Sequence, residues 1–120
     1  MIRPLIGGLL LVLGLPGVAQ ENATSGKGAV VRGLDKVNGQ TVDVQLFSGG
    51  TAAVLGLSVS LADCRYPADN PTGDAFAFLT IRETDADDIR FEGWMIASAP
   101  ALSALDHSRY DVWVLRCITS

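Results

Sequence analysis

Short runs in which apolar and polar residues alternate fill most of this chain, and turn-forming residues interrupt them roughly every ten positions. A period of two places successive side chains on opposite faces of a β-strand. The pattern predicts an all-β fold: a single small antiparallel β-sandwich or partly open barrel of about seven strands. One short helical turn is expected near residues 100–105.

The clearest hairpin lies in the first part of the domain. Residues 28–34 and 41–47 form two strand-like runs, and the second of them alternates cleanly. Asn38 and Gly39 stand between them, and Asn-Gly is the pair preferred by a tight type I′ turn. We therefore predict a hairpin closed at Asn38-Gly39.

A second hairpin follows, with strands at 51–55 and 57–66 joined around Gly56. Within its second strand the apolar positions change from one parity to the other. Such a switch of the buried face is typical of a β-bulge, which we place near Ala62-Asp63.

The first nineteen residues have the pattern of a secretory signal peptide. A short positive start is followed by an apolar run at 5–15 and by small residues at 17–19, which predicts cleavage after Ala19. The alternative is a membrane anchor, but eleven residues at about 1.5 Å each cover only about half of a ~30 Å bilayer core. We expect residues 20–27 to be a flexible leader and 28–120 a single β-domain.

Cys64 and Cys117 are the only cysteines. In an exported chain both thiols meet an oxidising compartment, so a disulfide between them is expected. The alternatives are a Cys/His metal site or a catalytic thiol, although the chain has one histidine and no C-x-x-C motif.

The charge and the acidic residues exclude other classes. A net charge of −4 argues against a nucleic-acid partner held by phosphate contacts. Asp85, Asp87 and Asp88 lack the spacing, central Gly and terminal Glu of an EF-hand and read as a solvated turn. No metal and no cofactor are predicted.

His107 is the single histidine, with Asp106 beside it, Ser103 four residues before it and Asp111 four residues after it. A Ser-His-Asp hydrolase would need this imidazole to activate a nucleophile, but no Gly-x-Ser-x-Gly motif is present. The other interpretation is that Asp106-His107 forms the turn before the last strand and binds local backbone.

The two tryptophans differ in their surroundings. Trp113 shares its parity with Leu115 and Cys117, which predicts packing in the core. Trp94 shares its parity with charged neighbours, so either exposure or burial is compatible with the pattern.

The segment 93–111 is the predicted partner-binding surface. It joins two strands by a connection that is longer than an antiparallel pair requires and unusually apolar for a loop. Leu102 and Leu105 could instead close the end of the sandwich, with Trp94 and His107 remaining outside. The candidate binding residues are Trp94, Leu102, Asp106 and His107.

Several stretches of the chain resemble one bacterial family. They are Cys-Arg-Tyr-Pro at 64–67, Asp-Ala-Phe-Ala-Phe-Leu at 74–79, Gly-Trp-Met at 93–95, and Pro-Ala-Leu-Ser-Ala-Leu-Asp-His at 100–107 running into Tyr-Asp-Val-Trp-Val-Leu at 110–115. They are similar to the domain-of-unknown-function family 2155, uncharacterised exported proteins of alphaproteobacteria, over about residues 28–117. Ile96 and Ser108 depart from the pattern, where an aromatic residue and a proline are expected.

The resemblance implies a periplasmic domain with no established activity, so no catalytic residues carry over. Family members are often encoded near an accessory subunit of the proton-pumping NADH:quinone oxidoreductase, which implies a respiratory-complex partner. The favoured hypothesis is a non-catalytic module that binds an envelope protein. The alternative is a small periplasmic hydrolase or ligand-binding domain that uses His107.

Overall fold

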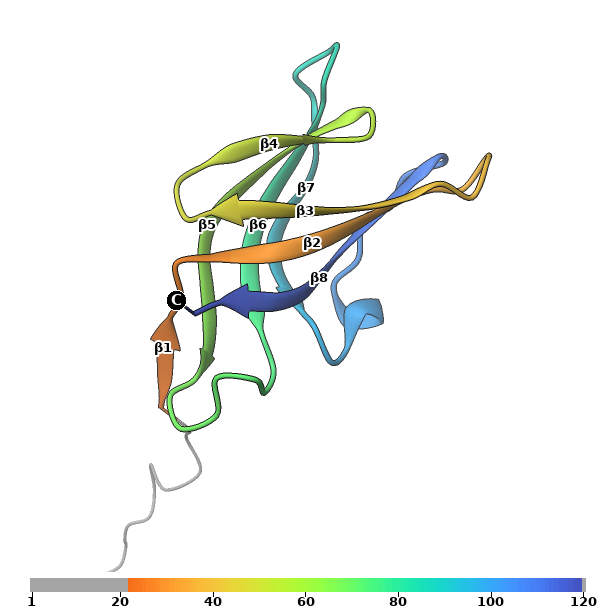
Figure 1. The fold of residues 1–120 in the computed structure, drawn as a ribbon. Coiled ribbons are helices and arrows are strands. Elements are labelled where there is room, and N and C mark those ends of the chain that lie inside the picture. Colours follow the sequence, from red (N-terminus) through yellow and green to blue (C-terminus); the bar gives the residue numbers. More distant parts are fainter. Residues whose placement is uncertain (1–21, 120) are drawn as a thin grey trace, which may run out of the picture.

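The computed structural model describes residues 22–119, which form two antiparallel sheets (Figure 1). The strands in chain order are β1 (Ala23–Ser25), β2 (Gly28–Asp35), β3 (Thr41–Phe47), β4 (Thr51–Val54), β5 (Leu57–Pro67), β6 (Phe76–Glu83), β7 (Ile89–Ile96) and β8 (Tyr110–Ile118). A turn of 3₁₀ helix, η2 (Pro100–Leu102), lies between β7 and β8. The predicted signal peptide lies outside the described residues.

The larger sheet has the order β1-β5-β6-β7, with β4 also paired to β5, and the smaller has the order β3-β2-β8. In Figure 1 the strands of the smaller sheet run across those of the larger sheet behind it. Each sheet turns one apolar face toward the other. The predicted all-β fold is confirmed, and of the two predicted architectures the structure has the sandwich, because within residues 22–119 the sheets do not close into a barrel.

The core lies between the two sheets and is built from alternating aliphatic positions of both. Its largest fully buried side chains come from β5, β6 and β7 on one side and from β2, β3 and β8 on the other. They include Leu57, Val59, Leu61, Leu79, Ile81 and Met95, facing Val31, Leu46, Val112 and Val114.

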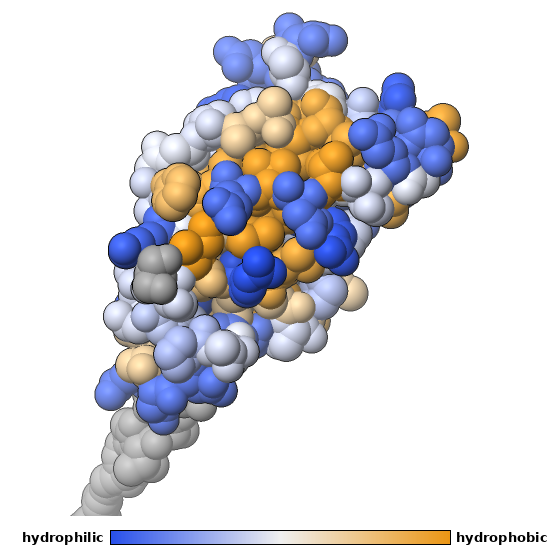
Figure 2. All heavy atoms as spheres, viewed as in Figure 1, coloured by the Kyte–Doolittle hydropathy of each residue, from blue (hydrophilic) through white to orange (hydrophobic). Residues whose placement is uncertain are grey.

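The outer face of the smaller sheet is mixed in character. Figure 2 shows apolar residues gathered over this face, with hydrophilic side chains standing among them. One hydrophilic pair crosses from β2 to β3, where Arg32 Nε lies 2.7 Å from the Asp43 carboxylate. The hydrogen bond from Arg32 lowers the pKa of Asp43.

The β2–β3 hairpin is confirmed, but its turn differs from the prediction. The loop spans residues 36–39, and among them Gly39 alone has a positive φ, of 78°. A type I′ turn needs a positive φ at both central residues, so the prediction of that turn at Asn38-Gly39 is wrong. The side chain of Asp35 shapes the longer loop, because its Oδ1 accepts the amide of Val37 at 2.9 Å.

The predicted bulge in β5 is confirmed, since the register against β6 shifts between Leu61 and Asp63. A second bulge was not expected: β8 shifts by one residue against β2 at Leu115. Counting alternate positions back from Cys117 therefore assigns the residues before Leu115 to the wrong face of the sheet. Trp113 lies half-buried on the outer face, and the prediction that it packs in the core is wrong.

Residues 22–27, the described part of the predicted flexible leader at 20–27, are ordered by contacts with β5 and β8. Within them β1 pairs with the end of β5. The amide of Gly26 then donates to the carbonyl of Cys64, and that of Lys27 donates to the carbonyl of Ile118, both at 2.7 Å. Polar side chains on a three-residue strand give no alternation by which the sequence could reveal it.

Candidate functional site

Residues 97–109 carry the chain from β7 in one sheet to β8 in the other. Pro100 begins η2, where its fixed φ and missing amide are suited to the first position. The amide of Leu102 donates to the carbonyl of Ala99 and closes this turn. Leu105 is 7% exposed and packs into the core, whereas Leu102 is 77% exposed. The connection thus seals the sandwich with one leucine and presents the other to solvent.

His107, near the end of this connection, is only 9% exposed. Its Nδ1 accepts the amides of Arg109 and Tyr110 at 3.0 and 3.1 Å, and its Nε2 lies 2.8 Å from the carboxylate of Glu83 on β6. The expectation that His107 remains outside is wrong. Burial is tolerated because both ring nitrogens have partners.

The same contacts fix what the imidazole can do. A ring nitrogen that accepts amide protons carries no proton itself, so Nε2 carries the hydrogen and donates it to Glu83. A general base needs a ring nitrogen that faces a nucleophile. Within residues 22–119 no hydroxyl group, that of Ser103 included, hydrogen-bonds to this ring. The geometry supports a structural role for His107 rather than hydrolysis.

Further polar contacts surround His107. The Oε2 atom of Glu83 also accepts Arg90 Nη1 at 2.7 Å, and Lys36 Nζ donates to the carbonyl of His107 at 2.7 Å. The Tyr110 ring lies beside the imidazole, with centroids 5.2 Å apart. These contacts tie the connection to β6, to β7 and to the β2–β3 loop.

Arg109 forms a second ion pair next to this cluster. Its Nη2 lies 2.9 Å from the buried carboxylate of Asp35, and its Nε also donates to that carboxylate. The hydrogen bond from Arg109 lowers the pKa of Asp35, with a smaller contribution from the amide of Val37 against the opposing effect of burial. The same pair raises the pKa of Arg109.

The remaining predicted site residues make no hydrogen bond or ring contact with the imidazole of His107 within residues 22–119. Trp94 is 43% exposed and packs edge-to-face against Phe78, with ring centroids 5.4 Å apart and an interplanar angle of 79°. Asp106 is exposed on the connection. No hydrogen bond or ring contact in the described chain joins Trp94 to His107 or Asp106, so the predicted residues do not make a single site.

A pocket of about 410 Å³ lies between the connection and β8. It is lined by Pro100, Ala101, Ala104, Asp111, Val112 and Trp113. The sequence pattern predicted Trp113 in the core and indicated Asp111 only as a possible partner of His107. Counting the alternation forward from Tyr110 would have placed both side chains on the outer face of β8. The walls are chiefly apolar, and Asp111 contributes the charged group.

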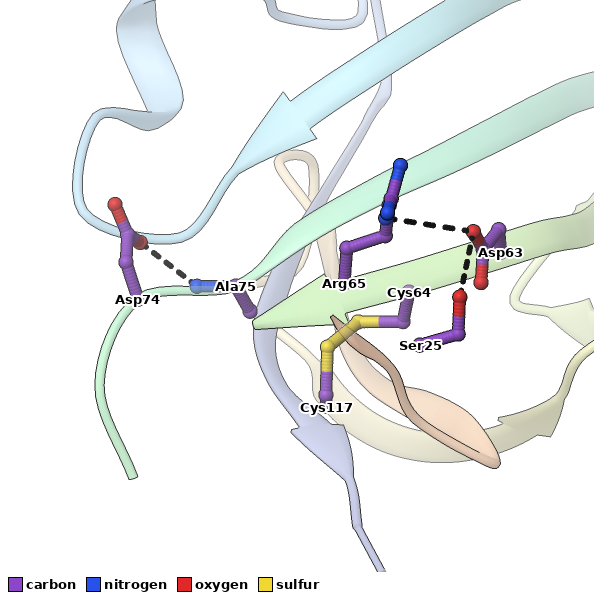
Figure 3. The surroundings of a disulfide bond; sticks show 7 residues. All are labelled: Ser25, Asp63, Cys64, Arg65, Asp74, Ala75 and Cys117. Atoms are coloured by element: carbon purple, nitrogen blue, oxygen red, sulfur yellow. Dashed lines mark hydrogen bonds and ion pairs between the residues drawn. A yellow bond between two sulfur atoms is a disulfide. The ribbon is translucent and has the colours of Figure 1, made fainter. Parts of the chain in front are cut away.

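The structure contains the predicted disulfide. Cys64 of β5 and Cys117 of β8 lie with their Cα atoms 5.7 Å apart, and the bond joins the two sheets. Figure 3 shows it beside the β5 bulge, where Ser25 Oγ donates to Asp63 and Arg65 approaches the same carboxylate. The cysteines are therefore used for cross-linking.

No metal site emerges from residues 22–119, where no three His, Cys, Asp or Glu side chains are placed to share an ion. Asp85 and its acidic neighbours form the β6–β7 turn, in which the amide of Asp87 donates to the carbonyl of Glu83 at 3.2 Å. The described part of the chain also has no helix that is long and apolar enough to cross a membrane.

The fold and its cross-link define a class: a small disulfide-bonded β-sandwich with an exposed apolar connection between its sheets. The chain belongs to the family described as "Uncharacterized protein conserved in bacteria (DUF2155)", which it matches over residues 29–117. It is also 26% identical over 100 residues to the uncharacterized protein RP359 of Rickettsia prowazekii. That match covers 81% of this chain and 63% of the relative. No solved structure matches the chain significantly.

Proposed function

We propose that the chain is a non-catalytic module, exported to the periplasm, that binds an envelope protein as an accessory or assembly subunit. The observation that carries this proposal is the connection between β7 and β8. It exposes Leu102 and borders a largely apolar pocket. Exposed apolar surface on a loop held by a rigid scaffold is typical of a protein-binding site.

Export is supported by two independent features. Residues 1–19 have the charge, apolar run and small residues of a cleavable signal peptide. The disulfide between Cys64 and Cys117 requires an oxidising compartment for its formation. Both features fit the periplasm.

The engagement of His107 argues against the alternative of a hydrolase. Its ring nitrogens bind the Arg109 and Tyr110 amides and Glu83, which leaves neither nitrogen to a substrate. A binding role therefore has to rest on other residues, and Leu102 and the pocket supply them.

Site-specific photo-cross-linking in living cells tests the proposal. A photoreactive amino acid is placed at Leu102, and a matched control is placed at Phe47, which is also exposed and apolar but lies on β3. We expect a discrete cross-linked protein from position 102 and none from position 47. Subunits of the respiratory NADH:quinone oxidoreductase are the first products to look for. The same products from both positions, or none from either, would contradict a binding surface here.

A further inference from the structure

The walls of the pocket favour one kind of side chain. Pro100, Ala101 and Ala104 present small apolar groups on the side of the connection, and the indole of Trp113 stands on the side of β8. A branched aliphatic side chain placed between them would lose its contact with water on both sides. The volume of about 410 Å³ is at the small end of ligand pockets, so it suits one or two side chains rather than a folded element.

Asp111 gives the pocket a charge that the described chain does not neutralise. Its Oδ1 accepts the amide of Val112 at 2.9 Å, and no cation within residues 22–119 pairs with its carboxylate. Arg32 and Arg109 are already held by Asp43 and Asp35.

The cation opposite Trp113 on β2 is Arg32, which Asp43 neutralises, so the unpaired charge at the pocket remains negative. Asp106 is exposed on the connection, and the whole chain has a net charge of −4. A partner with a positive charge next to its apolar group would therefore be attracted.

The backbone of β8 beside the pocket disfavours an added β-strand as the occupant. The amide of Val112 is already bonded to the Asp111 side chain, so it is not available to pair with an added strand. This engaged amide favours recognition at the pocket by side chains.

We propose that the pocket binds an aliphatic side chain of the partner polypeptide that is followed by a Lys or Arg, whose cationic group pairs with Asp111. This inference rests on the proposed function, because it assigns the chemistry of the partner at that surface. The aliphatic group fills the space between Ala104 and Trp113, and the cation meets the carboxylate at the pocket.

Capped hexapeptides and amide NMR of the intact disulfide-bonded protein test the proposal. The probes are Gly-Ser-Leu-Lys-Ser-Gly and two versions, one with Ala in place of Leu and one with Glu in place of Lys. We expect the Leu-Lys peptide to shift the signals of Ala101, Ala104 and the Trp113 indole. Replacing an attractive pair by a repulsive one should weaken binding about tenfold in the Glu peptide. The Ala peptide should bind more weakly because it buries less apolar area.

Two variants and their controls locate the site. Asp111→Asn should weaken the affinity for the Leu-Lys peptide about threefold. The variant should also lose the preference of the protein for the Leu-Lys peptide over the Leu-Glu peptide. Ala104→Leu fills the pocket and should abolish the shifts. Asp85→Asn and Ala86→Leu make the same chemical changes in the exposed β6–β7 turn and should leave binding unchanged.

Equal affinity for the Lys and Glu peptides, or no shift at pocket residues with any peptide, would overturn this inference. The proposed function is judged separately by the cross-link from position 102. A discrete cross-linked protein together with no charge preference would leave a protein-binding surface of different chemistry. The absence of that cross-link would reject the proposed function whatever the peptides do.

Discussion

The imidazole of His107 and the carboxylate of Glu83 lie 2.8 Å apart, although 24 positions separate them in the chain. Glu83 ends β6 in the larger sheet, and His107 stands just before β8 of the smaller sheet. The contact therefore holds the two sheets together at the end of the sandwich where β6 ends and β8 begins. The stability of this end should depend on whether both ring nitrogens of His107 keep their hydrogen-bond partners.

Two substitutions of His107 separate the contribution of the amide contacts at Nδ1 from that of the Glu83 contact at Nε2. His107→Ala removes the acceptor of the Arg109 and Tyr110 amides and one of the two donors to Glu83, so we expect a loss of about 2 kcal/mol or more in the free energy of unfolding. His107→Asn keeps an acceptor near the position of Nδ1 and should lose less. Urea unfolding of the two variants measures the difference, and equal losses would show that the amide contacts contribute little.

The two arginine–aspartate pairs should differ in their effect on stability. Arg109 pairs with a buried carboxylate, whereas Arg32 pairs with Asp43, a carboxylate that is exposed. Arg109→Ala leaves the Asp35 charge buried without a cation and should lower the unfolding midpoint in urea. Arg32→Ala should have a small effect because water solvates the freed carboxylate. Equal shifts of the midpoint in the two variants would contradict this account.

Acid should weaken the fold partly through Asp35. Its pKa is lower in the folded chain than in the unfolded one, mainly because Arg109 donates to it. The contribution to stability is therefore complete above the ordinary carboxyl range, near pH 4, and is lost as the pH falls through the lower, folded pKa. Urea unfolding from pH 7 down to about pH 3 should show a smaller loss for Asp35→Asn than for the parent chain. Parallel curves would exclude Asp35 as a source of the acid sensitivity.

The disulfide should account for a large part of the stability. It links residues 53 positions apart, and the chain-entropy model gives about 4 kcal/mol for a loop of this length. Replacing both cysteines by Ala should lower the free energy of unfolding by about 2–5 kcal/mol. Mass spectrometry of the exported protein without reductant should give a mass two hydrogens below that of the dithiol. Two thiols that react freely with an alkylating agent would reject the cross-link.

Export should remove the first nineteen residues. Because the small residues before Gln20 form a signal-peptidase site, we expect the mature chain to begin at Gln20 and to appear in the periplasmic fraction. Intact mass and N-terminal sequencing check the cleavage position. Recovery of the full-length chain in the inner membrane would contradict it.

Local patterns predicted the features that depend on neighbouring residues. The hairpins, the bulge at Ala62-Asp63 and the all-β class follow from alternation and turn residues, which left a sandwich and a partly open barrel both possible. The bulge at Leu115 has no such signal, because the residues around it continue to look like a regular strand. That single extra residue reversed the predicted face of Trp113 and concealed the pocket it lines.

Contacts between residues far apart in the chain could not be predicted from local sequence patterns. The burial of His107 depends on Glu83, and the shape of the β2–β3 loop depends on an Asp35 side chain that Arg109 holds from the far end of the chain. Polar residues next to turns are normally predicted to be exposed to solvent. Only the packing of the two sheets brings their partners within hydrogen-bond distance.

The central strand of the smaller sheet, β2, pairs with one strand that is close in the sequence and with another that is distant. β2 pairs with β3 immediately, but its other edge pairs with β8, and Gly28 stands opposite Ile118 at the last residue of that strand. Pairings between remote segments are slow to form, because the chain between them must first be brought together. Because synthesis proceeds from the N-terminus, β2 leaves the ribosome well before β8, and one edge of β2 stays unpaired until β8 has also emerged. The topology therefore prevents this nascent chain from completing its smaller sheet before β8 is available.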